Sequence, residues 1–442
     1  MPHLDRLRVQ GYKSIDDLEV DLGQINIITG RNNSGKTSLL ESVNLLFNTE
    51  DIRQFEGLAN YLINVDQDSA SISGYYMNQQ STLDEFSDTG TSLSNLGVEF
   101  RKPRDPEAIE AFIDVLHEIL ELNKRYPVAP SPLQDSPNIE EGVGEYNDLL
   151  SNSLRESASN LSGEELLGSG LKENILIIEH SGETYRYIHL GPYYEELREM
   201  LISRSIDRIL EHNFVKDRFH NVPQEEIAEE LYTSYDRLLA PRFGRPRFIG
   251  DPPPRLLGVT FLEEISGDKS EFDLEQENSA VKVSQIEQYL KSHDIMPDLK
   301  DFSFDKVVFE RKNRDPYEIP YEFLGGGVKV LIRVLWELYG EGQEYSILLL
   351  EEPENHMHPG YIENLVLQLV NISRRSQIQI LISTHDMDFI NSFFAPYVPE
   401  RNARFLRNNF KLIQQTGTAS KVMNYETCEN KINKLDLDLR GV

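Results

Sequence analysis

Apolar and polar residues alternate near the start of the chain and then give way to a continuous apolar run. Residues 4–22 place Leu and Val at alternating positions in two stretches, which predicts two strands joined by a turn. The run Ile25–Thr29 predicts a third strand that is buried on both faces and ends at Gly30. Ser38–Phe47 then carries apolar residues at helical spacing. The order strand, glycine-rich loop, helix follows from this pattern.

The middle of the chain has a different texture, with polar helical patterns separated by Pro and Ser clusters. The clearest helices are expected at Pro106–Tyr126, Tyr194–Asn213 and Pro223–Leu239. A hairpin is expected from Ile175–Glu179 and Thr184–His189. No heptad repeat is sustained over several turns, so the pattern favours an inserted lobe over a coiled-coil arm.

Buried strands and amphipathic helices alternate again after residue 305, which predicts a parallel sheet. The strands are expected at Val307–Phe309, Ser346–Leu350 and Gln379–Ser383, and the helices at Lys329–Tyr339 and Gly360–Ser373. We therefore expect an α/β head with a parallel core and antiparallel N-terminal strands, interrupted by a mainly helical insert. The expected divisions are 1–100 and 301–400 for the head, 101–300 for the insert, and 401–442 for a tail packing on the head.

Composition narrows the setting of the protein. The chain has 442 residues and a net charge of −30, which on average repels nucleic acid, so any DNA contact needs a local basic patch. No apolar run approaches the roughly 20 residues that span a bilayer, and the N-terminal stretch is too charged for a signal peptide. With a single Cys, Cys428, these features predict a cytoplasmic protein without membrane contact. The acidic, Lys-poor composition also fits a protein from a high-salt cytoplasm.

The first chemical motif follows the buried N-terminal strand. Gly30-x4-Gly35-Lys36-Thr37 fits a phosphate loop, in which backbone N–H groups face the phosphates, Lys36 reaches the β- and γ-phosphates and Thr37 offers its hydroxyl to Mg²⁺. The alternative is a glycine turn that only caps a helix. The residues expected to bind ATP here are Gly30, Asn32, Asn33, Ser34, Gly35, Lys36, Thr37 and Ser38.

The second motif lies near the other end of the chain. The apolar run Ile347–Leu350 is followed by Glu351 and Glu352, so a buried strand delivers two carboxylates at its C-terminal end. Alternation sends the two side chains different ways. We assign Glu351 to Mg²⁺ and Glu352 to the attacking water as general base. The alternative is an acidic strand end facing solvent, which leaves four consecutive aliphatic residues unexplained.

Two further features belong to the same edge of the predicted sheet. Gly325, Gly326 and Gly327 open a helix and expose backbone N–H groups suited to an anion, although a glycine triplet is also typical of a flexible turn. His385 follows the last strand, where it can hydrogen-bond a γ-phosphate; the alternative is a structural histidine.

Three other patterns carry less weight. His356 and His358 lack a clear third ligand, which argues against zinc. Leu161–Glu165 resembles an ATPase signature sequence but lacks its second Gly and lies in the polar insert. Gln79 and Gln80 follow a strand-like stretch and are the candidates for a Q-loop.

Taken in order, these motifs resemble the Walker A, signature, Walker B with D-loop, and switch-His motifs of ABC-type ATPase heads. More narrowly, Tyr12-Lys13-Ser14, the phosphate loop, the segment Glu351–Pro359 and Ser383–Asp386 resemble the OLD-like (overcoming lysogenization defect) branch, which is related to RecF and the structural-maintenance-of-chromosomes heads. The resemblance covers about 1–50 and 305–395.

The resemblance implies a dimer in which two heads enclose two ATP molecules. Lys36 and Glu352 of one subunit would face Gly325–Gly327 of the other, with Lys36, Glu352 and His385 as the catalytic residues. Gly325 stands where many signatures carry Ser, so hydrolysis is expected to be slower. Glu351 stands where Asp is commoner. Many OLD proteins continue into a Toprim nuclease domain, which this sequence lacks, so any nuclease effector is expected to be a separate protein.

Three functions therefore remain open from the sequence. The first is an Mg²⁺-dependent ATPase that acts as sensor or motor in anti-phage defence with a separate effector. The second is a RecF-like repair or recombination ATPase that binds DNA, which the net charge disfavours. The third is a scaffold that nucleotide organises without hydrolysis.

Overall fold

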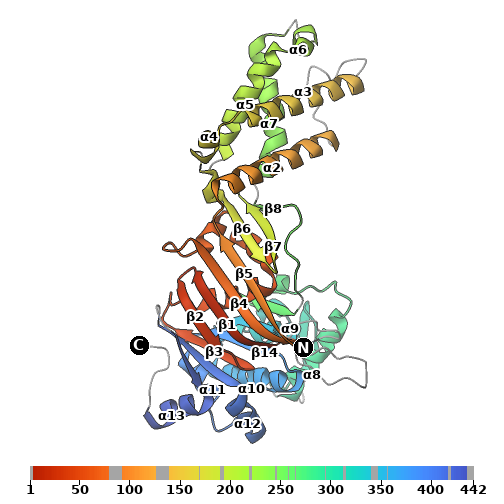
Figure 1. The fold of residues 1–442 in the computed structure, drawn as a ribbon. Helices are drawn as coiled ribbons and strands as arrows, with labels where there is room; N and C mark the ends of the chain where they lie inside the picture. The colour runs from red at the N-terminus through yellow and green to blue at the C-terminus, as the bar shows by residue number, and fades with distance from the viewer. Residues whose placement is uncertain are drawn as a thin grey trace, which may run out of the picture. The chain divides into compact units, whose positions relative to one another are not determined.

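Strands from distant parts of the chain form a six-stranded sheet in the computed structural model (Figure 1). The strand order is β16-β15-β3-β14-β13-β9, and all neighbours are parallel except β15 and β16. The structure describes residues 3–78, 92–125, 139–168, 170–189, 194–218, 222–243, 246–256, 258–263, 265–293, 295–311, 315–339, 347–355, 357–416 and 420–435.

The chain divides into two units, which we describe separately. The first unit holds Met1–Thr49, Ser71–Gly97 and Arg255–Val442, and the second holds Glu50–Ala70 and Val98–Pro254. This division differs from the expected insert at 101–300, because residues 255–300 contribute to the first unit. There β9 (Val259–Leu262) pairs with β13 (Ile347–Glu351) as a strand of the parallel sheet.

The sheet of the first unit is covered on both faces. Leu348 and Leu350 share a hydrophobic cluster with residues of α9 (Gly326–Leu338) and α10 (Pro359–Ser376). Helix α1 (Lys36–Phe47) packs against β9, β13 and β14 (Gln379–Thr384), and also against β1 (His3–Tyr12). Each residue of Ile347–Leu350 is fully buried. Burial on both sides explains the unbroken aliphatic run of this strand.

The N-terminal strands form an antiparallel sheet, as expected. β1 pairs with β2 (Ile15–Asp21) and with β4 (Ser69–Asn78), and β5 (Ser92–Arg101) lies beside β4. β3 (Ile25–Gly30) then enters the six-stranded sheet.

Two expectations for the C-terminal half are corrected by the strand pairing. Val307–Phe309 lies in β11, in the middle of a separate antiparallel sheet of order β10-β11-β12, and not in the parallel sheet. The segment expected as a tail supplies β15 (Phe410–Gln415), which pairs in parallel with β3. Short strands such as these carry too little periodicity to reveal their partners. The remaining elements of this unit are α8 (Ser279–Ser292), β10 (Leu299–Phe302), β11 (Lys306–Phe309), β12 (Tyr317–Pro320), α11 (Met387–Ser392), α12 (Glu400–Asn409), β16 (Ser420–Asn424), α13 (Tyr425–Leu435) and the 3₁₀ helices Lys269–Glu271 and Tyr321–Phe323.

The second unit is mainly helical and has its own hydrophobic core. The end of β5 pairs with β6, which forms the expected hairpin with β7, and β7 pairs with β8. Its elements are the 3₁₀ helix Thr49–Leu62, α2 (Asp105–Arg125), α3 (Ile139–Ser159), α4 (Gly163–Gly168), the 3₁₀ helix Leu171–Asn174, β6 (Ile175–His180), β7 (Glu183–Ile188), α5 (Tyr194–Glu211), α6 (Asn213–Arg218), α7 (Gln224–Phe243) and β8 (Arg247–Ile249). In the described parts of the chain no helix is long and apolar enough to span a bilayer.

Candidate nucleotide site

The loop between β3 and α1 turns sharply at Asn33 and Gly35. Both residues have positive φ, 63° and 93°, which places them in the left-handed region. Alternation of this kind turns successive backbone N–H groups toward one concave side, the arrangement that binds phosphate. Gly30 allows a close approach, because a Cβ there would lie 2.5 Å from both the Gln415 carbonyl oxygen and Ser34 Oγ. The local backbone therefore fits the phosphate-loop hypothesis.

Lys36 begins α1 and points back over this loop. Its Nζ donates to the carbonyl oxygens of Gly30 and Arg31, each at 3.2 Å, and the side chain is only 7% exposed. The ammonium thus lies within the loop, where it can reach the phosphates of a nucleotide held by the N–H groups.

Thr37 and Glu351 meet at the same edge of the sheet. The Thr37 hydroxyl donates to Glu351 Oε1. Hydroxyl and carboxylate oxygens are the ligands that Mg²⁺ prefers in proteins. The structure therefore places the two predicted metal ligands together.

Glu352 follows in the left-handed region, with φ of 40°. Its N–H donates to the Ser383 carbonyl oxygen at 3.0 Å, and its Oε1 lies 2.8 Å from His385 Nδ1. The carboxylate is 25% exposed and the imidazole 50%. A partly exposed carboxylate held by an imidazole is suited to take a proton from water.

Several buried hydroxyls at this edge have no partner among the described residues. They are Thr29 Oγ1, Ser34 Oγ and Ser383 Oγ. The register Ser383↔Ile28 and Glu351↔Ser383 brings the ends of β3, β14 and β13 to one edge. Buried polar atoms normally have hydrogen-bond partners. Phosphate oxygens would supply them, so the residues present fit a nucleotide with Mg²⁺.

The three glycines expected to form a signature motif lie at the start of α9 in the first unit. Gly325 precedes α9, and a Cβ there would meet nothing within 4 Å. A Cβ at Gly327 would come within 3.2 Å of Met357 and Tyr361, which follow the Glu352 turn. These contacts are not with the phosphate loop of the same chain. The described neighbours of Gly327 thus give no contact between these glycines and Lys36 of the same chain.

One acidic residue at this edge was not predicted. Glu263 directly follows β9, whose last residue Leu262 is in register with Leu350, the residue before Glu351. Its charge helps to raise the pKa of the buried Tyr12, an effect due first to burial and then to Glu41. The sequence signal was the apolar stretch before Glu263-Glu264, which repeats the pattern before Glu351-Glu352.

The weaker motifs gain no support as sites. Gln79, Gln80 and His356 lie outside the described residues. Within the described ranges no group of three acidic, His or Cys side chains is placed to hold a metal. Ser162 and Glu165 form reciprocal hydrogen bonds at the start of α4, so this signature-like stretch is a helix capping box.

Comparison with known proteins places this geometry in a family. Residues 3–242 match the family described as AAA ATPase domain. The chain belongs to the AAA ATPase domain family. Residues 181–391 also match the family described as AAA domain, putative AbiEii toxin, Type IV TA system.

This AAA ATPase domain protein is also similar to part of a curated relative. A stretch of 73 residues, 16% of the chain, is 38% identical to the DNA replication and repair protein RecF of Exiguobacterium sp. (strain AT1b). The matched stretch spans about a fifth of that relative, 19% of its length.

Solved structures that resemble this AAA ATPase domain protein include heads of Smc proteins. The Smc head domain with a coiled coil and joint from Pyrococcus yayanosii has a TM-score of 0.41 at 11% identity, with 99% of this chain and 100% of that chain covered. The Smc head domain from Pyrococcus furiosus, bound to the C-terminal domain of ScpA, has a TM-score of 0.38 at 12% identity, with the same coverage. The expected α/β fold class agrees with the mainly parallel six-stranded sheet, with the loop between β3 and α1, and with the family match.

Proposed function

We propose that the protein is an Mg²⁺-dependent ATPase whose site is completed by a second copy of the chain. The observation that carries this proposal is the meeting of Lys36, the Thr37–Glu351 pair and the Glu352–His385 pair at one edge of the sheet. Family membership supports ATP as the ligand.

Each side chain has a distinct role in this proposal. The loop N–H groups and Lys36 bind the β- and γ-phosphates, and Thr37 with Glu351 would hold Mg²⁺. The ion, when bound, neutralises charge on the phosphate oxygens. Glu352 orients the attacking water and takes its proton, while His385 holds the Glu352 carboxylate in place and donates toward the γ-phosphate.

The second copy follows from the position of the signature glycines. Gly325 is open on its Cβ side, and the described contacts of Gly327 are with Met357 and Tyr361. The Val328 N–H already donates to the Gly325 carbonyl oxygen at 3.0 Å, so the Gly326 and Gly327 N–H groups are the donors that we propose for a nucleotide held by another subunit. ATP would then stabilise a dimer, and hydrolysis would release it.

Glu352→Gln tests the proposal. The variant should retain ATP binding, lose turnover by about 10²- to 10⁴-fold, and accumulate as an ATP-bound dimer in light scattering. Phosphate release by the variant at the wild-type rate would remove Glu352 from its role. Absence of phosphate release by the wild type, with ATP-dependent dimerisation retained, would favour the scaffold alternative.

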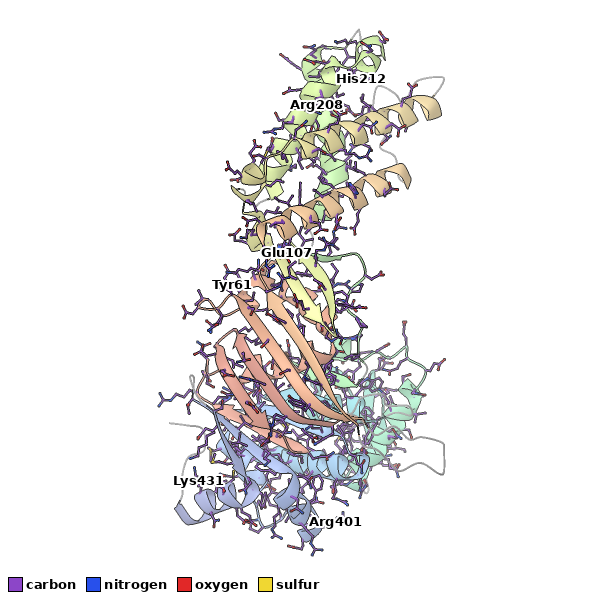
Figure 2. All side chains as sticks on the ribbon, viewed as in Figure 1. Tyr61, Glu107, Arg208, His212, Arg401 and Lys431 are labelled. Atoms are coloured by element: carbon purple, nitrogen blue, oxygen red, sulfur yellow. The ribbon has the colours of Figure 1, made fainter. Side chains whose placement is uncertain are left out.

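DNA binding is a second candidate function, and the distribution of charge favours it. Residues 400–435 hold seven Lys and Arg against three Glu, a local charge of +4 in a chain of −30. Arg401 and Arg404 on α12 are exposed and make no ion pair with any described residue. Lys421 and Lys431 lie together, and the pKa of Lys431 is lowered by burial and by Lys421. Figure 2 marks Arg401 and Lys431 on these C-terminal helices. Uncompensated cations of this kind suit a phosphate backbone.

Charge reversal separates this candidate from the first. Arg401→Glu with Arg404→Glu should weaken binding to duplex DNA by about tenfold or more and reduce the salt slope by about 2. The matched control reverses Lys300 and Arg311, two exposed cations that are paired with Glu310 and Asp298. If both double variants weaken DNA binding equally, the effect is a nonspecific response to net charge and the proposed DNA-binding surface is wrong.

For the biological role we keep the proposal that the resemblance to OLD-like proteins implies, which is anti-phage defence together with a separate effector protein. The segment Glu351–Pro359 carries that proposal, and a match to the family described as putative AbiEii toxin is compatible with defence. Plaque assays with the wild-type gene and with Glu352→Gln test it. Equal phage titres on both would argue against a defence role that depends on hydrolysis.

A further inference from the structure

Glu354 is a buried carboxyl group that the proposed mechanism does not use. It lies in the turn after β13, is 4% exposed, and its carbonyl oxygen accepts from the Met357 N–H at 2.9 Å. Its Oε1 accepts a hydrogen bond from the Thr384 hydroxyl. Its Oε2 is buried and has no partner in the described part of the chain. A half-satisfied buried carboxyl is costly, so it calls for an explanation.

Thr384 connects this carboxyl group to the turn that carries His385. While the Thr384 hydroxyl donates to Glu354, its oxygen accepts the Asp386 N–H at 2.9 Å. Asp386 in turn begins α11, because its Oδ1 accepts from the N–H groups of Asp388 and Phe389. The residues on both sides of His385 are thus linked to Glu354, Thr384 by its own hydrogen bond and Asp386 through the Thr384 oxygen.

The Glu352 turn and the end of β14 are therefore joined from two directions. On the exposed side Glu352 contacts His385, and on the buried side Glu354 contacts Thr384. The Glu352 N–H bond to the Ser383 carbonyl oxygen adds a third link. Asn355 Nδ2 also donates to Glu352 Oε2 at 3.3 Å, but this bond and the Glu352–His385 contact are on the exposed side, whereas the Glu354–Thr384 bond is buried.

We propose that Glu354 is a positioning residue for ATP hydrolysis, which holds Glu352 and His385 in register through Thr384. The inference rests on the proposed ATPase function and deepens it. Misplacement of a catalytic group by about 1 Å can cost on the order of 100-fold in rate. Loss of the buried bond should therefore lower kcat and leave ATP affinity nearly unchanged, because the phosphate loop is not touched.

The charge state of Glu354 supplies a readout that a purely structural role would not change. Burial raises the pKa of this carboxyl to about 7, the Thr384 hydrogen bond opposes the shift, and the nearby carboxylates of Glu352 and Asp386 add to it. Ionisation above neutral pH places a second negative charge beside Glu352. The Glu354→Gln side chain keeps an oxygen for Thr384 but cannot ionise.

Four variants of the full chain test the proposal. Glu354→Ala and Thr384→Val should each lower kcat by about 10- to 100-fold with the KM for ATP within about twofold, and the double variant should be no worse than the poorer single variant. Glu354→Gln should restore most of kcat and lose the wild-type change in kcat across about pH 6 to 8. Additive losses, or a normal kcat per nucleotide-binding site in Glu354→Ala, would overturn the proposal.

Hydrogen exchange provides a second measurement that does not depend on turnover. In Glu354→Ala, amide exchange should accelerate at residues 350–355 and 383–389 and stay unchanged in α9. A wild-type protein that hydrolyses no ATP would end the proposed function. Unchanged exchange at both turns would end the positioning role instead, so the two failures can be told apart.

Discussion

Thr37 donates a hydrogen bond to Glu351, although 314 positions separate the two residues in the sequence. Strand pairing is the cause. β14 lies between β3 and β13 in parallel register, so the first turn of α1 comes close to the last residue of β13. The two oxygens are thus brought together by the sheet, as the proposed Mg²⁺ site requires.

Substitutions at Thr37 should separate the hydroxyl from the shape of the side chain. Thr37→Val keeps the branched shape but removes the oxygen, so the Mg²⁺ concentration for half-maximal turnover should rise about tenfold or more. Thr37→Ser keeps the oxygen and should stay within about threefold of wild type. Titration of ATPase activity with Mg²⁺ measures both, and equal values for Val and wild type would exclude a metal role.

Lys36→Ala should weaken ATP binding by about 10- to 150-fold, because each hydrogen bond to a charged group contributes about 1.5 to 3 kcal/mol. Lys306→Ala is the control, since Lys306 is exposed and pairs with Glu318 on the three-stranded sheet. Calorimetric titration with ATP compares the variants. The same loss in both would show a general effect of charge.

Gly267 and Gly182 give a matched test of close packing. Both have positive φ, 68° and 84°, so Ala at either position strains the backbone. A Cβ at Gly267 would lie 2.3 Å from the Lys329 carbonyl group at the start of α9, whereas one at Gly182 would meet nothing within 4 Å. Gly267→Ala should lower the free energy of unfolding by about 2 to 5 kcal/mol and Gly182→Ala by about 1 to 2. Denaturant titration measures both, and similar losses would contradict the close approach.

Glu354 should make stability depend on pH in an unusual direction. Its pKa is raised to about 7 in the folded protein from 4.5, so the folded state binds the extra proton between these values. The stability contribution is therefore fully present below pH 4.5 and is lost as the pH rises through 7. Relative to Glu354→Gln, the wild type should lose on the order of 3 kcal/mol across this window. Unfolding titrations at several pH values check this, and parallel curves would refute the shift.

Much of the fold could be predicted because its elements are periodic. The alternation in β1 and β2, the apolar runs of β3 and β13, and the helical spacing of α5 are local signals. Pairing between distant strands leaves no such signal. Val307–Phe309 was therefore assigned to the parallel sheet although it pairs in the three-stranded antiparallel sheet. For the same reason β9 and β15 were not expected in the parallel sheet.

The site divides in the same way. Residue types and spacing indicated Lys36, Thr37, Glu351 and Glu352, and the structure places them at one edge. In the sequence Glu354 is one of several Glu residues after the apolar run, like Glu351 and Glu352. Its burial and its hydrogen bond to Thr384 distinguish it, and both are visible only in the structure. Environment of this kind arises from packing between strands and cannot be read from spacing.

The position of β15 also affects the synthesis of the protein. β3, which carries the phosphate loop, has β14 on one side and β15 on the other, and the Gln415 carbonyl oxygen lies against Gly30. A nascent chain that has already made Lys36 must wait for residues 410–415 before this strand gains its second neighbour. At roughly 5 to 20 residues per second, that delay is about 20 to 80 s. The ribosome-bound protein should therefore acquire its nucleotide pocket only after residues 410–415 have been made.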